Sequence, residues 1–208
     1  MEDKTARLFS PSAPGLIAIT PESPVADEGA KITALLKGGF ARVHLRHPGA
    51  LLREVKDIIE SVPPEFHSRL VLHGHFDLTH DFNLGGVHLN HRCPTPPVGY
   101  HGALSRSCHS LDELPCTDDL AYVTLSPILD SVSKSGYKSR FTPEDLQAIP
   151  RLTHTPVIAL GGITPERLPE LRALPFAGYA MLGAIPWEGK IPDVELFAAS
   201  TVKVLNIN

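Results

Sequence analysis

The chain alternates short apolar runs, rich in β-branched residues, with longer segments in which apolar residues recur at helical spacing. The runs predict eight strands, at 16–19, 41–45, 70–72, 86–89, 103–104, 122–125, 157–160 and 179–182, of which the one near 103–104 is the weakest. Helices are predicted at 28–37, 51–61, 76–82 and 193–204. Because repeated strand–helix units give parallel strands joined by crossover helices, the pattern predicts an α/β fold.

Two architectures are built from such units, a closed (β/α)8 TIM barrel and an open doubly wound sheet. The count of eight strands, and the absence of a G-x-G-x-x-G after the first strand, favour the barrel. The length of 208 residues fits one such barrel, so a single domain is expected over residues 1–208. In a barrel the chemistry lies on the face formed by the loops that follow the strands, so residues just after each strand are the first candidates.

Composition and charge exclude some other classes of protein. A net charge of -4 gives no electrostatic case for binding nucleic acid, and no apolar run approaches the length of a membrane span. The three cysteines lack C-x-x-C spacing, which suits a reducing compartment, and the charged first residues are not followed by an apolar secretory core. A cytoplasmic location is therefore expected.

Glycine-rich turns follow the last two predicted strands. The strand at 157–160 runs into Gly161-Gly162-Ile163, and the strand at 179–182 ends in Gly183-Ala184. Glycine lets the backbone approach a ligand closely and turn its N–H groups toward it. Paired turns in these two units predict a phosphate site built from the backbone amides of Gly161, Gly162, Ile163, Gly183 and Ala184. Two tight loops that merely needed glycine are the alternative.

Several short motifs occur in an order that resembles one known family. They are Gly86-Val87-His88-Leu89, Ser107-Cys108-His109-Ser110, Ser126-Pro127-Ile128, Ser131-Val132-Ser133-Lys134 and the run from Pro156 to Ile163. Together they resemble the thiamine phosphate synthase and thiazole tautomerase (TenI-like) family, from roughly Leu16 to Ile185. The resemblance implies an eight-stranded barrel. It also implies a small phosphorylated heterocycle as ligand, because the family's synthase joins a pyrimidine diphosphate to thiazole phosphate with magnesium holding the diphosphate.

The positions that hold the diphosphate in this family are altered here. The family's Gln-x-Arg-x-Lys corresponds to His44-Leu45-Arg46-His47-Pro48, so only the arginine is kept. Its Asn-Asp corresponds to His73-Gly74, and its second magnesium carboxylate to Cys93. Neither glycine nor a thiol is a normal magnesium ligand, because that ion prefers hard oxygen donors. No cofactor is therefore expected, and magnesium only if the chain is an active synthase.

The half of the site that binds thiazole phosphate in the family is largely kept. Ser131, Ser133 and Lys134 stand where the family has Thr-x-Thr-Lys, and both glycine turns remain. The resemblance implies that these residues and Ser107 contact the substrate. The tautomerase branch also lacks the magnesium pair, but its usual catalytic histidine falls at Pro127.

Histidines elsewhere offer a replacement for that base. His44 and Arg46 share strand parity and should point together into the barrel mouth, and His73 ends the third strand. We therefore expect His44, His73 and Arg46 to be catalytic, with His44 or His73 doing acid–base work on thiazole phosphate. A second hypothesis is a transition-metal site of His44 and His73 with His75 or Cys93, because imidazole and thiolate suit zinc. For the acid–base hypothesis, histidines that merely fill space are the alternative.

Three functions remain open at this stage: a tautomerase-type paralogue of the synthase, an active synthase, and a non-catalytic protein that binds thiazole phosphate. Magnesium dependence separates the second from the others, and absence of turnover marks the third. The segment Ser131 to Arg140 is expected to close over the ligand, with Gly136 as its flexible point. Apolar residues of the terminal helix not used to cover the barrel would allow a homodimer.

Overall fold

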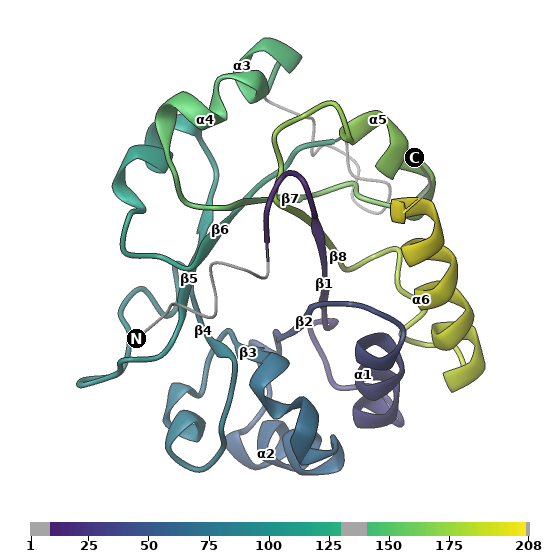
Figure 1. Cartoon of the computed structure of the whole chain (residues 1–208). Helices are drawn as coiled ribbons and strands as arrows, with labels where there is room; N and C mark the ends of the chain where they lie inside the picture. The colour runs from purple at the N-terminus through teal and green to yellow at the C-terminus, as the bar shows by residue number, and fades with distance from the viewer. Residues whose placement is uncertain (1–8, 130–140, 207–208) are drawn as a thin grey trace.

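The computed structural model describes residues 9–129 and 141–206, and these residues form a closed barrel of parallel strands in chain order. The strands are β1 (Gly15–Ile19), β2 (Arg42–Leu45), β3 (Leu70–Leu72), β4 (Gly86–Leu89), β5 (Leu104–Cys108), β6 (Tyr122–Leu125), β7 (Val157–Leu160) and β8 (Gly178–Met181). Strand β8 pairs with β1 and closes the barrel, with the helices outside it (Figure 1). The predicted TIM barrel is confirmed, and the open sheet is wrong.

The helices outside the strands are uneven in length. The α-helices are α1 (Glu28–Lys37), α2 (Leu52–Ser61), α3 (Pro143–Gln147), α4 (Ile149–Leu152), α5 (Leu168–Leu171) and α6 (Ile191–Asn206). The 3-10 segments are η1 (Pro64–Arg69), η2 (Phe76–His80), η3 (Leu111–Cys116) and η4 (Pro165–Arg167). Proline stands in the first turn of α3, α4, α5, η1 and η4, and inside η3, where it removes a backbone donor and limits helix length. No helix among the described residues is long and apolar enough to cross a membrane.

The interior of the barrel is divided into an apolar and a polar part. Ile17, Ile158 and Ala180, from β1, β7 and β8, form an apolar cluster with Phe9, whose ring lies 5.0 Å from that of Tyr122. On the other side the interior holds buried polar side chains from β2, β4, β5 and β6: His44, His88, Ser105, Tyr122 and Thr124. Since barrels of this class are normally filled by branched apolar residues, the polar part needs a separate explanation.

Candidate active site

A pocket of 210 Å³ opens among the loops that follow β2, β3 and β4. Its lining residues are Leu45, Arg46, His47, Pro48, Val55, His73, Gly74, His75, Arg92 and Cys93. Two of them are arginines, and none of these described residues has a carboxylate. The lining therefore suits an anionic ligand and offers no hard oxygen side chain to a magnesium ion.

Three histidines meet at this pocket and beneath it: His44 in β2, His73 directly after β3, and His88 in β4. His44 Nδ1 lies 2.9 Å from His73 Nε2, and the His73 and His88 rings are stacked with their centroids 4.3 Å apart. His44 Nε2 lies 2.7 Å from the hydroxyl of Tyr122. Because β2 and β6 are not neighbouring strands, this last hydrogen bond crosses the barrel interior. His44 and His88 are buried, and only His73 reaches the pocket.

Burial keeps these imidazoles neutral. It lowers the pKa of His88 to about 3, and it lowers the pKa of His44 and His73 well below the ordinary value. Repulsion from a protonated His88 would disfavour a second charge on either ring, which also lowers the pKa of both, and Arg46 and Arg92 act in the same direction on the pKa of His73. A neutral imidazole has one donor and one acceptor nitrogen, so each ring can pass a proton along or bind a metal ion.

Hydroxyl groups extend the histidine cluster around the polar side of the barrel. His88 Nδ1 lies 2.8 Å from Ser105 Oγ, and His88 Nε2 lies 2.9 Å from Ser107 Oγ. Burial raises the pKa of the nearby Tyr122 hydroxyl, and Ser105 acts in the opposite direction on that pKa. We call the six residues His73, His44, Tyr122, Ser105, His88 and Ser107 the barrel network. Beside it, Thr124 Oγ1 is buried and has no hydrogen-bond partner among the described residues.

The predicted catalytic residues lie at different depths. His44 and His73 are in direct contact. Arg46 lines the pocket together with His73, and its guanidinium pairs with Glu22 at 3.2 Å. His44 lies below the pocket with no exposed surface, so a ligand in the pocket meets His73 and not His44.

The residues of the metal hypothesis are only partly brought together. His75 Nε2 is hydrogen-bonded to the carbonyl of Ala50 at 2.8 Å, away from the cluster, while Cys93 lines the pocket. The described residues that group as possible metal ligands are His44, His73 and His88, with one ring nitrogen from each within 4.8 Å of the others. Their nitrogen donors suit zinc rather than magnesium. Both ring nitrogens of His88 already have serine partners, which favours a hydrogen-bonded network.

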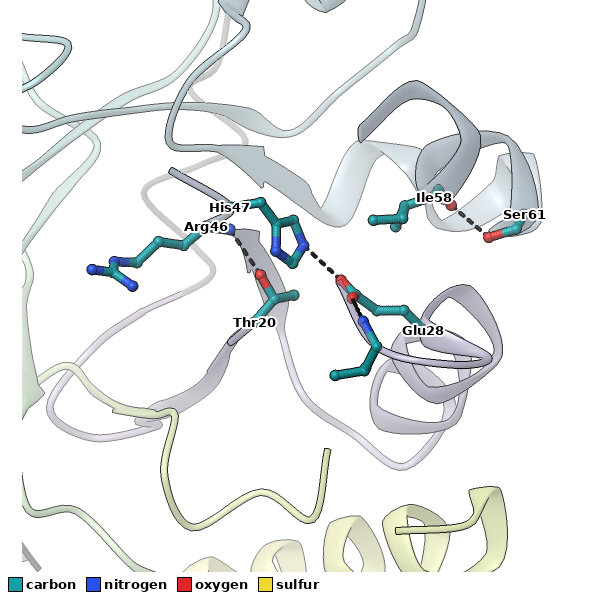
Figure 2. A network of polar contacts seen from close by, with 7 residues as sticks. Thr20, Glu28, Arg46, His47, Ile58 and Ser61 are labelled. Atoms are coloured by element: carbon teal, nitrogen blue, oxygen red, sulfur yellow. Dashed lines mark hydrogen bonds and ion pairs between the residues drawn. The ribbon is translucent and has the colours of Figure 1, made fainter. Parts of the chain in front are cut away.

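A buried pair below Arg46 fixes the loop that carries it. His47 Nε2 lies 2.7 Å from Glu28 Oε1, both side chains are buried, and the other Glu28 oxygen accepts from the amide of Val25 at 2.9 Å. The backbone amide of Arg46 donates to Thr20 Oγ1 at 2.8 Å. Figure 2 shows His47 turned toward Glu28 and the Arg46 side chain extending the opposite way. The loop after β2 is therefore tied to α1 and to the end of β1.

The first of the two glycine turns has a backbone form that favours glycine. Gly161 and Gly162 have φ of +95° and +66°, in the left-handed region that favours glycine. A side chain at Gly161 would also lie 2.9 Å from Pro127 Cα, so packing alone gives one reason for glycine there. Gly183 is exposed and the Ile163 side chain is buried. Ser131, Ser133 and Lys134, and the expected lid over 131–140, lie outside the described residues.

Sequence reasoning did not assign a role to His88, Ser105 or Tyr122. A signal was present, because strands of a parallel barrel are normally apolar on both faces, and polar residues inside them are unusual. Which of these residues would meet across the barrel depends on the strand register, and spacing along one strand does not give that.

The fold and the site define a (β/α)8 barrel with a cationic pocket and neutral histidines at the end where the strands lead into their loops. Residues 16–185 match the family described as thiamine monophosphate synthase, and the chain belongs to that family. The resemblance noted from the short motifs is thus confirmed.

Individual similar proteins support this family assignment. A putative thiamine-phosphate synthase of Geobacter sulfurreducens is 28% identical over 166 residues, which are 75% of this chain and 78% of that protein. The structure of thiamine phosphate pyrophosphorylase from Bacteroides thetaiotaomicron is similar with a TM-score of 0.79 and 31% identity, covering 91% of this chain and 96% of that one. A thiamine phosphate pyrophosphorylase from Pyrococcus furiosus, with 19% identity and a TM-score of 0.73, supports the fold alone.

Proposed function

We propose that this protein binds thiazole phosphate at the pocket end of the barrel and moves a proton on it, as a tautomerase-type paralogue of the synthases. One observation supports this most strongly: neutral His73 lines a pocket with Arg46 and Arg92, and no described lining residue has a carboxylate. Departure of a diphosphate depends on charge neutralisation by a metal ion, whereas proton transfer needs a neutral base near the ligand.

The histidine, the arginines and the backbone amides of the site have different roles. His73 Nε2 faces His44, which leaves His73 Nδ1 as the nitrogen that takes the proton from the ligand. Arg46 and Arg92 orient the anionic ligand by charge. The amides of the turns at 161–163 and 183–184 bind the phosphate, and Ser131, Ser133 and Lys134 contact the ligand as in the related family. No metal ion takes part.

An active thiamine phosphate synthase is the second candidate, supported by the names of the relatives and by the retained Arg46. In that case Arg46 and Arg92 would neutralise the diphosphate together with magnesium held by the substrate itself. A non-catalytic protein that binds thiazole phosphate is the third candidate, and it would use the same phosphate turns.

Two incubations separate the three candidates. The purified protein is first given thiazole phosphate and pyrimidine diphosphate, with and without magnesium, and then the immature thiazole tautomer alone. We expect no condensation, and conversion of the tautomer that falls roughly 10²- to 10⁴-fold in His73→Asn. His91→Asn, at an exposed position outside the pocket lining, is the control. Magnesium-dependent thiamine phosphate would establish the synthase, and inactivity on both substrates the binder.

A further inference from the structure

Asn90 comes directly after β4, and its side chain joins the loop after β3 to the loop after β4. Its Nδ2 donates to the carbonyl oxygens of His73 at 2.9 Å and His88 at 3.0 Å. Its Oδ1 accepts from the backbone amides of Arg92 at 3.1 Å and Cys93 at 3.3 Å. The orientation of the side-chain amide is unambiguous, because two carbonyl groups face one end of it and two N–H groups face the other.

We propose that Asn90 is a positioning residue for the proton transfer, and that it sets the place of His73 relative to Arg92. Three of its four partners, His73, Arg92 and Cys93, line the pocket, whereas Asn90 is not among the described lining residues. Asn90 therefore acts through these residues and not on the ligand. This inference rests on the proposed function, since it needs His73 as the base and Arg92 as a charge that orients the anion.

The side chain of Asn90 uses its full capacity for hydrogen bonds. A primary amide has two donor hydrogens and two acceptor lone pairs, and all four have a partner here. The backbone adds a closed turn, because the amide of Asn90 donates to the carbonyl of Cys93 at 3.1 Å and the amide of Cys93 donates back at 3.0 Å. The side chain then connects this turn, which carries Arg92, to His73. The two loops cannot shift past each other without breaking these bonds.

The connection lies where the strand pairing stops. The pairing of β3 with β4 reaches Leu72 and Val87, and His73 follows directly after β3. The backbone amide of His73 donates to the carbonyl of Leu45 in β2 at 3.1 Å. The backbone of His73 is therefore bonded to β2 through its amide and to the loop after β4 through its carbonyl, which Asn90 holds. These two bonds fix the point from which the His73 ring enters the pocket.

The loop that begins at His73 is held at a second point. His75 has a φ of +51°, in the left-handed region that favours glycine, and its Nε2 lies 2.8 Å from the carbonyl of Ala50. Such a conformation persists only where the surroundings hold it in place. Asn90 and Ala50 thus anchor the loop 73–75 at its two ends. Proton transfer depends on this, because misplacing a reacting group by about 1 Å can cost about 100-fold in rate.

The first test needs no turnover. The ring Cε1–H signal of His73, assigned by its loss in His73→Asn, is compared by NMR in the wild type, in Asn90→Ala and in the isosteric Asn90→Asp. Both Asn90 variants remove the donor to the carbonyl of His73, so we expect the signal to move in both. Gln147→Ala is the control, because the Gln147 side-chain amide donates to the carbonyl of Ala173 at 2.8 Å and neither residue lines the pocket. A His73 signal that is unchanged in both Asn90 variants would overturn the proposal.

The second test measures turnover of the immature thiazole tautomer. We expect kcat in Asn90→Ala to fall roughly 10- to 100-fold, because the base is displaced. KM should change by less than about threefold, because the proposed phosphate turns and the backbone turn that carries Arg92 remain. Asn90→Asp should show the same fall in kcat, and Gln147→Ala should keep the wild-type values.

A wild-type kcat in both Asn90 variants would contradict the positioning role. A wild type that converts no tautomer contradicts the proposed function instead, and the NMR comparison still decides whether Asn90 positions His73.

Discussion

Hydrogen bonds offset the cost of burying polar side chains inside this barrel. His44 and His88 each have both ring nitrogens engaged, and His44 bonds to two other members of the same network. A buried polar group without a partner costs about 1–3 kcal/mol, so a network that satisfies nearly all of its groups is tolerated where one isolated histidine would not be. Thr124 Oγ1, on the same polar side of the barrel, is one buried atom that has no hydrogen-bond partner among the described residues.

The neutral histidines make the stability of the fold depend on pH. The pKa of His88 in the folded state is about 3, below the ordinary value of 6.5 that applies when the chain is unfolded. Between these values the unfolded state binds the extra proton, so the free energy of unfolding falls as the pH falls below about 6.5. From pH 7 to pH 5 we expect a loss of about 2 kcal/mol from His88 alone. His44 and His73 act in the same direction.

Urea unfolding at pH 7 and pH 5 measures this loss. In His88→Gln the decrease in unfolding free energy between pH 7 and pH 5 should be smaller by the contribution of His88. This holds even if the variant is less stable at both pH values. A wild-type stability that is equal at pH 7 and pH 5 would show that these imidazoles do not remain neutral in the folded protein.

At the scale of elements, the apolar runs located most strands because both faces of these strands are buried. The predicted ends of β3, β4, β6 and β7 agree with the structure. The apolar pattern predicts only the start of strand β5, because Ser105-Arg106-Ser107 interrupts that pattern within the strand. Ser105 and Ser107 belong to the candidate site, so the apolar pattern fails to predict the part of the strand that carries polar site residues.

The turn after β7 is constrained by packing, and we propose that it also binds the phosphate. In Gly161→Ala the new side chain meets Pro127 and the φ of +95° becomes strained, so we expect a loss of stability of about 2 kcal/mol and weaker binding of thiazole phosphate. Gly49→Ala is the control, because a side chain there would find no atom within 4 Å. Urea unfolding and calorimetric titration measure both effects. Unchanged binding in a folded Gly161→Ala protein would mean that the glycine serves packing alone.

The candidate site could be predicted only in part. Positions shared with the related family led to His44, His73 and Arg46, and the structure brings the first two into contact. The partners across the barrel, Tyr122 and His88, could not be derived from spacing along the chain, because a closed barrel brings non-neighbouring strands together only through its overall curvature.

At the scale of the whole molecule, an anionic ligand should raise the thermal stability of the protein, and magnesium alone should not. A ligand that binds only the folded state raises its stability by about 2.7 kcal/mol at a hundred times its dissociation constant. We therefore expect thiazole phosphate to raise the midpoint of thermal unfolding and magnesium alone to leave it unchanged, because the described pocket lining has no carboxylate. His73→Asn should keep the thiazole phosphate shift, since we propose that the glycine turns bind the phosphate, and Arg46→Gln should reduce it. If magnesium added to pyrimidine diphosphate gives a larger shift than either alone, the diphosphate half of the site is intact and the synthase becomes the better assignment.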